Sequence, residues 1–304
     1  MSPSRPKRIV SLIASATEIV FELGLGEFLV GRSHECDYPT SVSDLPCCTR
    51  PRFDCSGNSR EIDELVKQSL RDALSIYEVF DDVLQELQPT HIITQTQCEV
   101  CAVSLRDVER SVASRLKSCP KIVALAPNSL ADIWDDFRRV ADAVGVSAEP
   151  ALNRLVSRTA AVTRQGLRPR VACIEWLEPL MAAGNWVPEL VELAGGENLF
   201  GKAGEHSPWM TWEELVKADP DIIIAMPCGF SIERTLPEMH WLTDRPGYSK
   251  LSAVRNESVY AADGNQYFNR PGPRVVESLQ ILIDIFNGST SKHSDGFVKL
   301  PVPS

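Results

Sequence analysis

Residues 94–104, TQTQCEVCAVS, hold the pair of side chains in this sequence whose spacing best suits chemistry. Cys98 and Cys101 are separated by two residues and follow the short apolar run 91–94, HIIT. Such a run indicates a strand that ends here and passes the two thiols to a loop. A C-x-x-C pair occurs in zinc sites, in redox-active dithiols and as small residues that line a turn.

The zinc and redox interpretations need partners elsewhere in the chain. A structural zinc ion takes four ligands and the pair supplies two, so His34 and Cys36 are the candidates for the others. A redox dithiol is normally recognised by a thioredoxin-like context, which this sequence lacks. Zinc binding, redox activity and simple lining of a turn therefore stay open as alternatives.

The common catalytic motifs are absent from the sequence. It contains no G-x-G-x-x-G after a strand, no P-loop, no H-E-x-x-H and no G-x-S-x-G. The five histidines are scattered, and His91 opens an expected strand, which favours a structural role. These observations predict a protein that binds a ligand without catalysis.

Candidate ligand contacts come from loops that follow expected strands, because ligands of open α/β sheets gather at the carboxyl ends of the strands. The loops are 14–18 (ASATE), 33–39 (SHECDYP), 94–101, 175–179 (EWLEP), 227–230 (PCGF) and 263–273 (DGNQYFNRPGP). Aromatic, amide and thiol groups dominate them. That composition suits a large, partly apolar ligand.

The elements behind these loops alternate between β-branched apolar runs and helical patterns, which is typical of α/β proteins. Strands are expected at 7–13, 28–33, 89–95, 121–127, 169–176, 219–227 and 257–264. Helices are expected at 15–27, with Ser15 as N-cap, and at 59–87, 129–146, 148–167, 186–196, 211–218 and 273–287. The stretches LQELQPTHIITQ and LVKADPDIIIAM repeat one unit of helix, proline break and isoleucine run.

This pattern predicts two α/β lobes with central parallel sheets, joined by a long backbone helix. The boundaries are 1–128 for the N-terminal lobe, 129–165 for the bridging helix, 166–287 for the C-terminal lobe and 288–304 for a polar, loop-like tail. A cleft between two lobes is a favoured place for a small molecule.

Composition narrows the class of partner and the expected location. A net charge of −10 argues against nucleic acid and anionic membranes, which recruit basic patches. No apolar run reaches the length of a membrane span, and the N-terminus has no clean signal-peptide pattern. Nine irregularly spaced cysteines favour reduced thiols. The expected location is therefore the cytoplasm.

Several stretches resemble the cobalamin-binding, helical-backbone class of substrate-binding proteins. The resemblance rests on RIVSLIASATEIVFELGLGEFLVGRSHECDYP, LQPTHIITQ, LVELAGGENLF, PWMTWEELVKADPDIIIA and NQYFNRPGPRVVESLQIL, and it spans roughly residues 8–286. Siderophore, heme and cobalamin binders share this frame. The resemblance implies non-catalytic binding of cobalamin or a related corrinoid in the cleft between the lobes.

The resemblance also implies which residues hold the ligand. The candidates are Ser15, Thr17, Asp37, Tyr38, Gln95, Gln97, Cys98 and Cys101 in the first lobe, and Trp176, Tyr267, Phe268 and Arg270 in the second. The aromatic rings would cover the corrin faces, the glutamines would meet its peripheral amides, and the two cysteines would line the pocket or lie near cobalt.

Three departures from this class keep two alternatives open. The secretion signal is missing, residues 51–80 look like an insertion, and cysteines at 36, 98 and 101 are untypical. One alternative is a metal-dependent or redox-active protein that uses His34, Cys36, Cys98 and Cys101, with zinc as the metal. The other is the substrate-binding subunit of an ABC-type importer for a heme, siderophore or corrinoid.

Overall fold

The computed structural model describes residues 6–71, 76–96, 105–115, 118–160, 168–288 and 296–301. The chain forms two compact units. Unit 1 comprises Met1–Ser56, Glu64–Pro127 and Ala131–Arg154, and unit 2 comprises Gly57–Asp63, Asn128–Leu130 and Leu155–Ser304.

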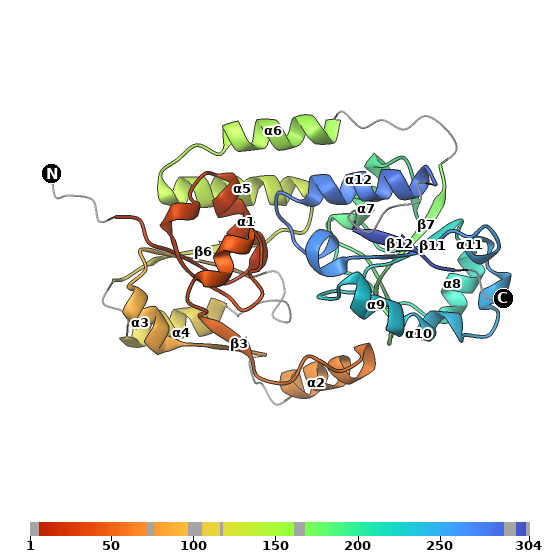
Figure 1. The fold of residues 1–304 in the computed structure, drawn as a ribbon, viewed down its shortest axis with the longest axis horizontal. Helices are drawn as coiled ribbons and strands as arrows, with labels where there is room; N and C mark the ends of the chain where they lie inside the picture. The colour runs from red at the N-terminus through yellow and green to blue at the C-terminus, as the bar shows by residue number, and fades with distance from the viewer. Residues whose placement is uncertain are drawn as a thin grey trace. The chain divides into compact units, whose positions relative to one another are not determined.

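Unit 1 is built on a parallel sheet, shown in red to yellow in Figure 1. The strand order is β2 (Leu29–Arg32), β1 (Ile9–Ser11), β5 (His91–Gln95) and β6 (Lys121–Leu125). A separate antiparallel pair joins β3 (Thr49–Pro51) to β4 (Tyr77–Val79). The helices are α1 (Ala14–Glu22), α3 (Asp81–Leu87), α4 (Leu105–Arg115) and α5 (Leu130–Val144). Leu84 of α3 and Val108 of α4 pack in one core cluster with sheet residues such as Ile92.

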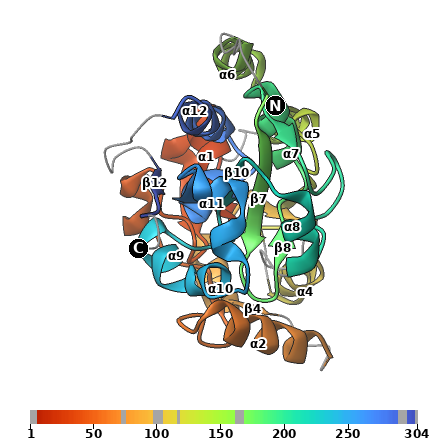
Figure 2. The ribbon, with the colours of Figure 1, turned by 90° about the vertical axis from the view of Figure 1, so that its right-hand side faces the viewer.

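Unit 2 has a mixed sheet whose central strands are parallel (Figure 2). The order is β12 (Phe297–Lys299), β11 (Val259–Ala262), β10 (Ile222–Ala225), β7 (Arg170–Trp176) and β8 (Met181–Ala182), and β9 (Glu197–Asn198) pairs with β7. The edge strands β12 and β8 run antiparallel to their neighbours. All four residues of β10 are buried, as expected for a central parallel strand with both faces covered.

Helices cover both faces of this second sheet. They are α7 (Val187–Leu193), α8 (Trp212–Ala218), α9 (Ile232–Glu238), α10 (His240–Thr243), α11 (Ser252–Arg255) and α12 (Val275–Phe286). Residues of α8, α10 and α11 share one core cluster with alternate residues of β7 and β10, while α7 and α12 lie together (Figure 1). Short 3-10 turns occur at Gly26–Phe28, Thr40–Asp44 and Tyr248–Lys250, and a π-helical turn at Gly264–Phe268.

The repeated helix–proline–strand unit is present in both units of the structure. Gln88 ends α3 and Asp219 ends α8, each in the left-handed conformation with φ of 42°. Each donates its backbone N–H to the residue four positions earlier, Leu84 or Leu215. Because the proline that follows cannot continue a helix, the chain then turns into β5 or β10. The α/β architecture with parallel sheets is thus confirmed.

Three local expectations are wrong, those for Ser15, for residues 59–87 and for the tail. Ser15 does not cap the first helix, because α1 already begins at Ala14 and Ser15 is buried inside it. The helix expected over 59–87 is divided into α2 (Ser59–Arg71), β4 and α3. By contrast, the two helices expected at 129–146 and 148–167 correspond to α5 and α6 (Glu149–Ala160), which are separated at Gly145 with φ of +73°. The tail is not loop throughout, since β12 pairs with β11.

The described residues also bear on membrane insertion. No helix among them is long and apolar enough to cross a bilayer.

Candidate functional site

In unit 2, aromatic side chains gather where β7 and β10 end. Trp176, the last residue of β7, is 9% exposed, and its ring meets that of Phe230 nearly edge-on at 5.3 Å between centroids. The guanidinium of Arg234 lies 3.9 Å from the centre of the Phe230 ring. The indole N–H of Trp176 donates to the carbonyl oxygen of Ser59 at 3.2 Å. Trp176 is therefore already engaged by the chain itself.

The loop after β11 is a buried polar turn. Asp263 accepts hydrogen bonds from the backbone N–H of Gln266 at 2.7 Å and from its side-chain amide at 3.1 Å. Burial raises the pKa of the Asp263 carboxyl above its ordinary value, against the opposing effect of these hydrogen bonds. Gly264 is required here, because a Cβ would lie 2.1 Å from the carbonyl oxygen of Pro227 at the end of β10.

Two buried arginines complete this turn. Arg270 donates to the side-chain oxygen of Asn265, and Arg274 to that of Gln266, each at 3.1 Å. The guanidinium of Arg274 also lies 5.4 Å from the centre of the Tyr267 ring. The arrangement presents amide and guanidinium groups next to an aromatic ring that is half-buried.

Phe268, one of the aromatic residues expected to cover a face of the ligand, is buried in the core. This side chain is 1% exposed, because the π-helical turn directs it into the core. Tyr267 stays half-buried in the same turn. The ligand roles of Tyr267, Phe268, Arg270 and Trp176 remain predictions.

In unit 1, the expected residues divide into a buried group and an exposed group. Ser15, Thr17 and Gln95 are 1%, 0% and 3% exposed. By contrast, Asp37 is exposed and Tyr38 is 48% exposed. Among these five described candidates, Asp37 and Tyr38 therefore offer accessible surface, and the ligand roles of all five stay predictions.

Cys36, the cysteine next to Asp37, is buried inside unit 1. The hydroxyl of Thr17 donates to the sulfur of Cys36 at 3.0 Å, and the Ser33 hydroxyl lies 3.3 Å from the same sulfur. Burial raises the pKa of the Cys36 thiol. A buried, neutral thiol is neither a good nucleophile nor a ready metal ligand.

The zinc and redox alternatives depend on residues that are only partly described. His34 lies with its Nδ1 2.9 Å from the Thr49 hydroxyl, and burial together with Arg32 lowers its pKa to about 4. Among the described residues, no group of three or more His, Cys, Asp or Glu side chains is placed to hold a metal ion. Gln97, Cys98 and Cys101 lie outside the described residues, so their roles remain predictions.

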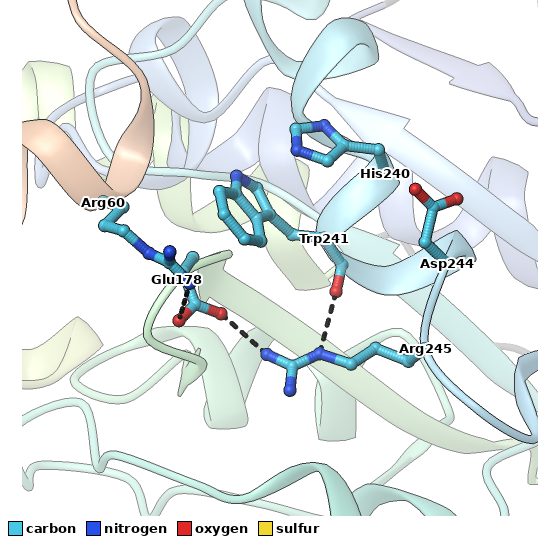
Figure 3. A pocket seen from close by; sticks show the side chains of 6 residues that line it. All are labelled: Arg60, Glu178, His240, Trp241, Asp244 and Arg245. Carbon is cyan, nitrogen blue, oxygen red and sulfur yellow. Dashed lines mark hydrogen bonds and ion pairs between the residues drawn. The ribbon is translucent and has the colours of Figure 1, made fainter.

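A cavity of about 290 Å³ lies in unit 2 beside the strand ends (Figure 3). It is lined by Arg60, Glu178, His240, Trp241, Asp244 and Arg245. The Glu178 carboxylate accepts from Arg60 at 3.1 Å and from Arg245 at 2.7 Å. The Arg60 guanidinium lies over the Trp241 ring at 4.4 Å from its centre. The cavity thus joins one carboxylate to two guanidiniums and an aromatic face.

Of the residues that line this cavity, only Glu178 lies in a loop predicted from the sequence. The loop EWLEP, which contains Glu178, was expected at a strand end. Trp241 lies in the short helix α10 and Arg245 follows the end of that helix, so no helical spacing in the sequence pairs them. Arg60 is 118 positions from Glu178, and no periodicity in a single sequence pairs residues so far apart.

Comparison with known proteins identifies relatives along nearly the whole chain. A family model described as periplasmic binding protein matches residues 9–265. The vitamin B12-binding protein of Vibrio cholerae is 25% identical over 281 residues, which cover 91% of this chain and 88% of the relative. An uncharacterized ABC transporter substrate-binding lipoprotein of Bacillus subtilis is 24% identical over 295 residues, covering 94% and 82%.

Solved structures share the fold. The crystal structure of a periplasmic heme-binding protein from Pseudomonas aeruginosa superimposes with a TM-score of 0.69, at 18% identity, covering 99% of this chain and 100% of that one. The resemblance to helical-backbone substrate-binding proteins is therefore confirmed.

The expected cytoplasmic location is wrong. The matching family is one of periplasmic binding proteins, and one of the relatives is a lipoprotein of an ABC transporter. Both point to a location outside the cytoplasm. The expectation failed because it relied on the absence of a recognisable signal and on the number of cysteines, neither of which bears on the solute-binding fold itself.

Proposed function

Because the chain belongs to the periplasmic binding protein family, we propose that it captures a cobalamin-like corrinoid for an ABC-type importer. The similarity to the vitamin B12-binding protein of Vibrio cholerae, over 91% of the chain, is the observation that carries the proposal. The names of the relatives describe binding proteins, which agrees with ligand capture without catalysis.

The chemistry of the strand-end loops suits such a ligand. A corrin ring presents broad apolar faces and a rim of amide groups. Trp176 and Tyr267 supply aromatic surface, and Asn265, Gln266 and Arg270 supply amide and guanidinium groups for the rim. Large, partly apolar ligands are commonly held by this combination of aromatic surface and a few placed polar groups.

Heme is the second candidate ligand. Tyr38 is 48% exposed, and a tyrosine phenolate is one of the protein groups that hold heme iron. A heme has two propionate carboxylates where a corrin has amides. Arginines would therefore form ion pairs with a heme but hydrogen bonds to the neutral amides of a corrin. Tyr38→Phe removes the phenolic oxygen and keeps the ring.

Absorbance titration of the purified protein separates the two candidates. Under the proposal, hydroxocobalamin and cobinamide each change the spectrum at one equivalent, and Tyr38→Phe alters neither affinity by more than about threefold. If only hemin saturates the protein, and Tyr38→Phe abolishes that spectrum, the ligand is a heme and the corrinoid assignment is wrong.

A further inference from the structure

Residues 57–63 belong structurally to unit 2, although the chain on either side of them belongs to unit 1. We call this segment the strap. It contains the first residues of α2, which begins at Ser59. The side chains around it, all of unit 2, show how the segment is held there.

Ser59 is the centre of the anchor. It is 0% exposed, and both its backbone N–H and its hydroxyl donate to one oxygen of Glu238, at 3.1 and 2.6 Å. Its carbonyl oxygen accepts the indole N–H of Trp176. The Glu238 side chain is 8% exposed, and the same oxygen accepts the indole N–H of Trp241 at 3.1 Å. Two of these three hydrogen bonds to the buried carboxylate therefore come from the strap.

Two arginines hold the strap on either side of Ser59. Arg234 of unit 2 donates to the carbonyl oxygen of Gly57 at 2.9 Å. Arg60, which belongs to the strap, donates a hydrogen bond to the Glu178 carboxylate, and its guanidinium lies over the Trp241 ring (Figure 3). Hydrogen bonds that involve charged groups are stronger than neutral ones, so these contacts fix the segment in one place.

The strap also carries its own helix start. The Asn58 side chain accepts the N–H of Glu61, and the Glu61 carboxylate accepts the N–H of Asn58, each at 3.0 Å. This reciprocal pair satisfies two backbone donors that the first turn of a helix leaves free. The start of the helix is therefore held by bonds within the strap, independent of those to Glu238 and Trp176.

We propose that the strap is a latch that covers Trp176 and opens to admit the ligand. This inference rests on the proposed function, which places Trp176 among the ligand contacts. With the latch closed, the indole N–H is occupied by Ser59 and the ring is 9% exposed. A ligand that uses the indole N–H of Trp176 must first displace the carbonyl oxygen of Ser59. The apparent affinity is then lowered by the fraction of molecules in which the latch is closed.

Ser59→Pro weakens the latch, because it removes the two hydrogen bonds to Glu238 and keeps the carbonyl oxygen at position 59. Ser59 is the first helical residue of α2, a position that accepts proline because its N–H has no partner within the helix. Asn58, the residue before it, is the N-cap of the helix. A residue that precedes proline prefers an extended backbone, and this is the usual conformation of an N-cap residue. The substitution removes both donors to Glu238 and leaves the helix start intact. Gln68→Ala, at an exposed position of the same helix, is the matched control.

The indole N–H of Trp176 reports directly on the latch. In protein labelled with ¹⁵N-tryptophan, each of the six tryptophans contributes one indole resonance, and Trp176→Phe identifies the relevant one. Exchange of this proton with solvent is expected to be at least about tenfold faster in Ser59→Pro than in the wild type, and unchanged in Gln68→Ala. Equal exchange rates in the wild type and Ser59→Pro overturn the latch.

A second arm adds the ligand. Saturating hydroxocobalamin is expected to shift the Trp176 indole resonance and remove its bond to Ser59, and Ser59→Pro is expected to bind about tenfold more tightly. Binding that leaves the wild-type Trp176 resonance in place, or that weakens in Ser59→Pro, overturns the proposal. If neither hydroxocobalamin nor hemin binds any form, the proposed function fails, and the exchange rates of the ligand-free proteins still decide whether the latch exists.

Discussion

At the scale of single residues, the candidate side chains of unit 2 are held in place by polar partners before any ligand arrives. Asp263 fixes Gln266, and Gln266 in turn accepts from Arg274 beside Tyr267. Such fixed groups lose little conformational freedom on binding, which favours affinity. The type and approximate place of these residues could be predicted from the strand-end loop. Their mutual hydrogen bonds could not, because they depend on a π-helical turn that leaves no periodic signal.

Tyr267→Ala is expected to weaken corrinoid binding by about 1–3 kcal/mol, or roughly tenfold to a hundredfold. The reason is the loss of an aromatic ring that covers part of the apolar corrin face. Isothermal titration calorimetry measures the change. Trp209→Ala is the control, because Trp209 is 57% exposed and lies outside the candidate set. Equal losses in both variants would show that the effect is not specific to the site.

His34 is expected to make the protein less stable in mild acid. Burial, and then Arg32, lower its pKa to about 4, whereas an unfolded histidine titrates near 6.5. Between these values the unfolded chain binds more protons than the folded one, so the free energy of unfolding falls as the pH falls from about 6.5 to 4. The contribution at pH 5 is about 2 kcal/mol relative to pH 7.

Urea unfolding of the wild type and His34→Gln at pH 7 and pH 5 isolates this contribution. The difference in unfolding free energy between the two proteins should change by about 2 kcal/mol between these pH values, with the variant gaining relative to the wild type at pH 5. A difference that stays constant with pH would mean that His34 is not titrating as the structure indicates.

At the scale of elements, regular strands and helices could be predicted wherever burial imposes a clear period. The isoleucine run of β10 and the apolar face of α12 are examples. Prediction failed where long-range pairing decides the structure. β4 exists because it pairs with β3, and β12 because it pairs with β11. Strands of three residues are too short to show an alternation of apolar and polar side chains. They can therefore be assigned only when the structure shows the strand with which they pair.

Phe297→Ala is expected to lower the free energy of unfolding by about 3–4 kcal/mol. Phe297 is 1% exposed, and its ring meets that of Tyr260 at 6.0 Å between centroids, so truncation leaves a cavity under the edge of the sheet. Urea unfolding monitors the change, with Lys299→Ala on the same strand as an exposed control. A loss below about 0.5 kcal/mol in Phe297→Ala would contradict the packing of β12.

At the scale of the whole molecule, the fold and the binding class could be predicted from motifs spread along nearly the entire chain. The location could not, because it is set by export and not by the solute-binding fold. The number and spacing of the cysteines also led to the wrong prediction of a cytoplasmic location. Among the described residues, the free ones are Cys36, Cys47, Cys48, Cys55, Cys119, Cys173 and Cys228. Free thiols therefore accompany a family whose relatives act outside the cytoplasm.

Calorimetric titration tests the central claim, capture of a corrinoid, most directly. Protein at about 50 µM, a concentration suited to affinities of micromolar or better, is titrated with cyano-, hydroxo- and adenosylcobalamin and with cobinamide. We expect at least one of these four ligands to saturate the protein at one ligand per chain and to change its own absorption spectrum on binding. The absence of both heat and spectral change with all four ligands would contradict the assignment.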